Sequence, residues 1–157
     1  MNRHMAIWGI IFLIIFGAAQ YAVPSYLDAA MMWVAIGIIF LVLNFVMGSK
    51  MKGTEGAKHT WMSLVVFGFI VTLVVALGYV SLELSWLMSL WLLLYGVGIY
   101  SEGQAQNIQM HTAGGLFLVI TALFVPAFGA NYFLAGALFL GLYTLIGGLI
   151  AAPPKGT

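Results

Sequence analysis

The sequence contains very little charge and no cysteine. Only 6% of its 157 residues are charged, with five Lys or Arg, four Asp or Glu and a net charge of +1. Soluble domains carry about 25% charged residues, so this chain has too few to cover a surface that faces water. The small net charge also provides no basic patch for nucleic acid. The lack of cysteine excludes disulfide bonds, thiolate metal sites and thiol redox chemistry.

Apolar residues are abundant instead. Hydrophobic residues account for 64% of the chain, and the mean hydropathy is +1.12. Six stretches of about 17–21 residues have no acidic or basic residue in their interior, and a helix of that length crosses a membrane. Backbone hydrogen bonds in lipid must be made within the segment, so each stretch is a predicted helix. We predict an all-α integral membrane protein with a single transmembrane domain, 1–157, and six transmembrane helices: Met5–Val23, Ala29–Met47, Trp61–Val80, Leu84–Tyr100, His111–Phe128 and Tyr132–Ala152.

The positive charges predict the orientation. If six helices alternate in direction, one side carries only Asp28 and Glu83, and all the bases lie on the other side: Arg3, Lys50, Lys52, Lys58 and Lys155. Cytoplasmic loops are enriched in Lys and Arg, so both termini are predicted to be cytoplasmic, in a plasma (inner) membrane. A second interpretation of the N-terminus is a cleavable signal peptide, whose removal would leave five helices in the same orientation.

The helices pair into three hairpins, at about 5–47, 61–100 and 111–152. The first and third each combine a glycine-bearing first helix, a turn proline and a second helix with glycine. The middle hairpin lacks the turn proline. Either the hairpins are repeats of one unit, or apolar helices of low complexity look alike by chance. Small residues four apart, such as Ala137 and Gly141, indicate that the sixth helix is either a central packing helix or an oligomer contact, unless they only reflect the frequency of glycine in membrane helices.

This hairpin pattern resembles the HdeD-like acid-resistance membrane proteins, small six-helix proteins of the prokaryotic inner membrane. The resembling stretches are Trp8–Phe45 and Ala113–Ile150, with Thr60–Ser101 less similar. The resemblance implies a role in stress tolerance and brings no catalytic residues.

Few side chains offer chemistry at membrane depth. Four polar residues inside helices are predicted either to line a path for a small neutral solute or to form interhelical hydrogen bonds: Gln20, Asn44, Thr72 and Thr121. His111, at the cytoplasmic start of the fifth helix, is a candidate for a pH-responsive interface. His4 and His111, at the starts of the first and fifth helices, could also pair as haem ligands. The alternative interpretation is that these histidines lie at the membrane interface without a specific role. The chain shows no catalytic triad, phosphate-binding loop or metal-binding motif, so we expect no enzymatic activity and no cofactor.

These observations give three hypotheses for function. The first is a non-enzymatic multi-pass protein, related to acid or other stress tolerance, that acts by packing with itself or with partner membrane proteins. The second is an oligomeric channel for a small neutral solute. The third is an accessory subunit of a larger membrane complex. All three place the chain in a lipid bilayer and none involves nucleic acid.

Overall fold

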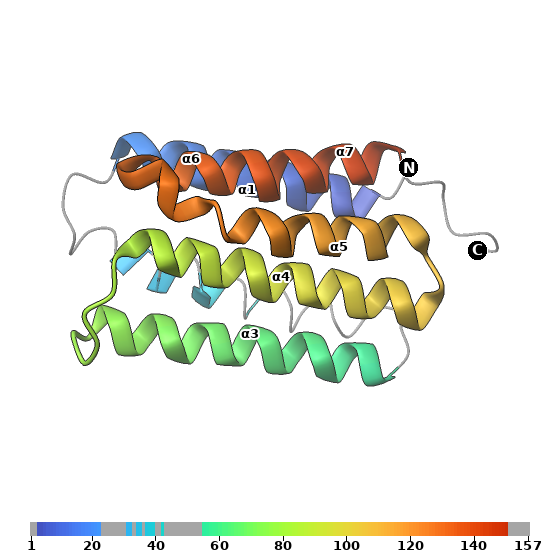
Figure 1. The fold of residues 1–157 in the computed structure, drawn as a ribbon, viewed down its shortest axis with the longest axis horizontal. Coiled ribbons are helices and arrows are strands. Elements are labelled where there is room, and N and C mark those ends of the chain that lie inside the picture. The colour runs from blue at the N-terminus through green and yellow to red at the C-terminus, as the bar shows by residue number, and fades with distance from the viewer. Residues whose placement is uncertain are drawn as a thin grey trace.

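The computed structural model describes residues 3–22, 31–32, 34–35, 37–39, 42 and 55–150. This part of the chain is entirely helical apart from its turns, which confirms the all-α prediction (Figure 1). Its elements are α1 (Arg3–Ala22), α3 (Glu55–Ala76), α4 (Leu84–Gln106), α5 (Gln109–Ala122), η1 (Val125–Asn131), α6 (Tyr132–Gly136), η2 (Ala137–Leu142) and α7 (Tyr143–Ile150). Three stretches are long and apolar enough to cross a membrane: His59–Ala76, Leu84–Gln106 and Val125–Ile150. Most of the predicted second helix lies outside the described residues.

The fourth helix is longer than predicted. We expected it to end at Tyr100 before a polar loop, but α4 continues to Gln106 and only Asn107 and Ile108 separate it from α5. Glu, Gln and Ala are good helix formers, so the loss of hydropathy after Tyr100 does not end the helix. Asn107 ends it instead, in the left-handed conformation (φ 53°) that Asn tolerates.

The fifth helix is shorter than predicted. We expected it to reach Phe128, but α5 ends at Ala122 and is followed by the 3₁₀ segment η1. Pro126 lacks the N–H that would bond the Ala122 carbonyl in a continuous α-helix, which explains the break. Beyond η1 the chain is helical without interruption from Tyr132 to Ile150, and η2 is a π-helical segment within that run.

Neighbouring helices pack antiparallel, with glycine at the closest approaches. Gly9 of α1 lies against the backbone of Leu145 in α7, and Gly141 of η2 lies against that of Leu13. These contacts confirm the predicted packing role of the sixth helix. Figure 1 shows α3, α4 and α5 side by side, with α1 running beside the α6–α7 run. The three-hairpin repeat and the orientation of the termini remain predictions.

The described part of the bundle has an apolar core, as a soluble protein has, but its exterior is apolar as well. The core combines large apolar residues such as Phe12 and Met88 with five buried hydroxyl side chains: Thr72, Ser85, Ser89, Thr121 and Thr144. Large apolar side chains also cover the outside, and Ile14 is 64% exposed and Phe67 54% exposed. Exposing apolar area to water costs about 25 cal/mol per Å². The outer surface therefore suits lipid tails.

Candidate functional site

Thr72 forms a hydrogen-bonded bridge between α3 and α4. Its side chain is fully buried, and its hydroxyl donates to the Gly68 carbonyl at 2.8 Å. The same oxygen accepts the indole N–H of Trp91 from α4 at 3.1 Å. Both polar groups of the pair are thus satisfied at membrane depth, which is the interhelical arrangement that the sequence offered as one interpretation of Thr72.

Gln20 links the end of α1 to the start of α6. Its amide nitrogen donates to the Ala130 carbonyl at 3.1 Å and lies 3.4 Å from the Asn131 side-chain oxygen. Its amide oxygen accepts the backbone N–H of Leu134 at 3.1 Å. The first N–H groups of a helix have no partner inside the helix, so Gln20 caps α6 from a neighbouring helix.

Thr121 is buried near the end of α5 and donates to the Leu118 carbonyl at 3.0 Å. Gln20, Thr72 and Thr121 therefore lie on α1, α3 and α5, and no hydrogen bond joins any two of them. Asn44 lies outside the described residues. A common path for a solute stays a prediction for these four positions.

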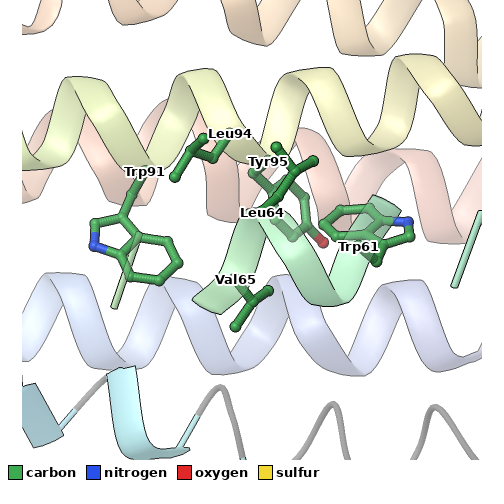
Figure 2. A pocket seen from close by; sticks show the side chains of 6 residues that line it. All are labelled: Trp61, Leu64, Val65, Trp91, Leu94 and Tyr95. Carbon is green, nitrogen blue, oxygen red and sulfur yellow. The ribbon is translucent and has the colours of Figure 1, made fainter. Parts of the chain in front are cut away.

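A small cavity lies between α3 and α4 beside the Thr72–Trp91 pair. Figure 2 shows its lining of Trp61, Leu64, Val65, Trp91, Leu94 and Tyr95. Its volume of about 10 Å³ corresponds to roughly one water molecule. The ring of Trp61 meets that of Tyr95 edge-on at 5.1 Å, and Tyr95 meets Phe12 of α1 in the same manner at 5.5 Å. These aromatic contacts join α3, α4 and α1 and leave no room for a larger solute at this point.

Glu102, in the last two turns of α4, accepts two hydrogen bonds. The indole N–H of Trp61 donates to one carboxylate oxygen at 3.3 Å, and the Gln106 amide donates to the other at 3.2 Å. Sequence reasoning missed this contact because it placed Glu102 in a loop. The helix propensity of Glu102, Gln104, Ala105 and Gln106 indicates that the helix continues past Tyr100, but it does not identify Trp61 as the partner.

His111 lies in the first turn of α5 and is partly buried. Its Nδ1 is buried without a hydrogen-bond partner, as is the hydroxyl of Tyr143 from α7. The Tyr143 hydroxyl packs directly on Gly114, one helical turn from His111. The Tyr143 hydroxyl is therefore an unsatisfied polar group at the contact of α7 with α5. Whether His111 responds to pH stays a prediction, and the side chain of His4 lies outside the described residues.

Within the part of the chain that the structure describes, no group of three His, Asp or Glu side chains is placed to hold a metal ion. Comparison of the chain with protein-family models, with curated proteins and with solved structures found no match.

Proposed function

We propose that the chain is a small, non-enzymatic, multi-pass membrane protein that acts by packing against copies of itself or against other membrane proteins. The observation that carries this proposal is the apolar exterior, on which large apolar side chains are exposed around a core that is itself mainly apolar. Such an exterior offers few groups to a water-soluble ligand. It complements lipid tails and the apolar faces of other membrane helices.

The hydrogen bonds inside the bundle support the same proposal. Thr72 and Thr121 donate to carbonyls of their own helices, and Gln20 binds backbone groups of η1 and α6. Gln20 joins α1 to η1 and α6, and Thr72 joins α3 to α4 through the indole of Trp91, whereas Thr121 bonds only within α5. This favours a packing role over transport through the described part of a single chain.

The orientation and the physiological role rest on the sequence. The Lys and Arg distribution supports cytoplasmic termini in a prokaryotic inner membrane. The hairpin pattern that resembles the HdeD-like proteins supports a role in acid or other stress tolerance. Cells that lack the protein should then survive acid exposure less well than the same cells with the chain restored.

The experiment that tests the packing role is extraction of the full chain from its native membrane in mild detergent, followed by measurement of the particle's mass and composition. A homo-oligomer supports self-association, and flux assays in liposomes then decide whether the oligomer conducts a small neutral solute. Stoichiometric partner proteins support the accessory-subunit form of the proposal. A monomer without partners, at several protein-to-detergent ratios, would contradict the proposal.

A further inference from the structure

Trp61 and Glu102 form a polar site where the apolar part of α4 ends. Glu102 lies two residues beyond Tyr100, the last residue of the apolar run, and it is partly buried. Trp and Tyr are enriched at the level of the lipid headgroups. The carboxylate of Glu102 is therefore at headgroup depth when the bundle lies in a membrane.

One face of α4 sets the position of the Trp61 indole. Tyr95, Gly98 and Glu102 are spaced three and four residues apart, so they lie in one row on that helix. The Trp61 ring meets Tyr95 edge-on at 5.1 Å, as Figure 2 shows. Gly98 leaves the space for the ring, since a Cβ atom there would lie 2.8 Å from ring carbons of Trp61. With the ring held in this way, its N–H meets the carboxylate of Glu102.

The carboxylate is held by neutral donors. The Trp61 N–H donates to one oxygen at 3.3 Å and the Gln106 amide donates to the other at 3.2 Å. A carboxylate accepts about four hydrogen bonds, so these two leave acceptor positions for further donors. Neutral donors orient the group and do not cancel its charge.

The end of α4 adds to the negative potential. The C-terminus of a helix carries a partial negative charge, and α4 has no basic residue in its last turn. The side chain of Lys58, one turn before Trp61 on α3, lies outside the described residues. The helix end and the carboxylate both favour a cation at this position.

We infer that Glu102 and Trp61 bind the primary ammonium group of an amphiphile, which a membrane supplies as an aminophospholipid such as phosphatidylethanolamine. The ammonium donates to the remaining acceptor positions of Glu102, and the indole face attracts its charge. A quaternary ammonium has no N–H to donate, so phosphatidylcholine should bind less tightly. A free long-chain amine has the same chemistry as the aminophospholipid. The inference rests on the proposed membrane function.

The test follows lipid binding to the full natural chain in detergent micelles by native mass spectrometry. Phosphatidylethanolamine, its N-methyl and N,N-dimethyl derivatives and phosphatidylcholine, all with the same acyl chains, are added separately. We expect binding to weaken along this series, with phosphatidylethanolamine bound about fivefold more tightly than phosphatidylcholine. Equal binding along the series would overturn the inference. Because the series uses the natural chain, its result does not depend on whether a variant folds.

Substitution locates the site. Glu102→Gln keeps the size of the side chain and removes its charge, so it should weaken phosphatidylethanolamine binding about fivefold and remove the preference over phosphatidylcholine. Glu83→Gln is the matched control, because it makes the same change at the N-terminal end of α4, and it should keep the preference. A preference that persists in Glu102→Gln overturns the site.

Two further results separate the sources of the ligand and the underlying proposals. Dodecylammonium that binds through Glu102, while no lipid in the series does so, identifies a free amine as the ligand. Equal binding of every lipid, with dodecylammonium unaffected by Glu102→Gln, overturns the ammonium site and leaves the membrane assignment intact. A chain that binds no lipid and stays dispersed without detergent overturns the membrane assignment together with the inference.

Discussion

Replacing Gly96 by Ala should weaken the contact between α4 and α5. A Cβ atom on Gly96 would lie 2.8 Å from the Gly115 carbonyl oxygen and 2.9 Å from the Val119 amide nitrogen. Both are backbone atoms, so no side-chain rotation relieves the clash and the helices must move apart. In the Gly115→Ala variant of α5, the Cβ atom would enter the same contact from the opposite helix, at 2.6 Å from the Gly96 carbonyl oxygen.

The expected loss follows from this geometry. An ordinary van der Waals contact needs about 0.6 Å more separation than this clash leaves. If the helices move apart by that distance, neighbouring atoms lose a quarter or more of their dispersion energy. Overpacking of a tight core typically costs about 1–3 kcal/mol, and we expect each variant to fall in that range. Because both substitutions widen the same gap, the double variant should lose less than the two single losses added together.

The assay is unfolding in mixed micelles with increasing SDS, followed by tryptophan fluorescence and circular dichroism. Gly17→Ala is the matched control, since Gly17 lies in α1 and a Cβ there would have no neighbour within 4 Å. It should be neutral or stabilise by up to about 1 kcal/mol, because Ala favours helix over Gly. The reasoning is refuted if Gly96→Ala costs no more than Gly17→Ala.

Three further variants test the polar contacts. Thr72→Val should lower the free energy of unfolding by about 0.6 kcal/mol. In a double-mutant cycle with Trp91→Phe, the coupling energy should be up to about 1.7 kcal/mol. A coupling energy of zero would contradict the hydrogen bond between Thr72 and Trp91. Gln20→Leu should cost about 1 kcal/mol in the same SDS titration, because it leaves backbone groups of η1 and α6 unpaired, and a neutral effect would refute its capping role. Tyr143→Phe removes a buried hydroxyl that has no partner, so it should leave the free energy of unfolding unchanged or raise it by about 1 kcal/mol; a marked loss would show that this hydroxyl is bonded.

For the part of the chain that the structure describes, the apolar runs were sufficient to predict the existence and class of the helices. They did not predict correctly where the fourth and fifth helices end, because hydropathy and helix propensity are different properties. Residues 101–106 are polar yet helical, so α4 runs past the predicted end at Tyr100. Pro126 lies inside an apolar run yet interrupts the helix that was expected to reach Phe128.

The contacts between helices were harder to predict. The helices are apolar around most of their circumference, so periodicity does not show which face points inward. The small and hydroxyl residues do carry that signal: Gly96 and Gly103, seven apart on α4, both face α5. The partner of a polar side chain, such as Trp91 for Thr72, depends on helix rotation and register, which one sequence does not contain.

The most direct test of the central claim is the accessibility of single nitroxide labels on the full chain in lipid discs. Labels at Ile14→Cys, Phe67→Cys and Ile120→Cys should collide readily with oxygen, which dissolves in lipid, and rarely with a water-soluble nickel chelate. A label at the buried Leu118→Cys should be protected from both. Ready collision of the three outer labels with the nickel chelate would show that the apolar exterior faces water, and would contradict the account.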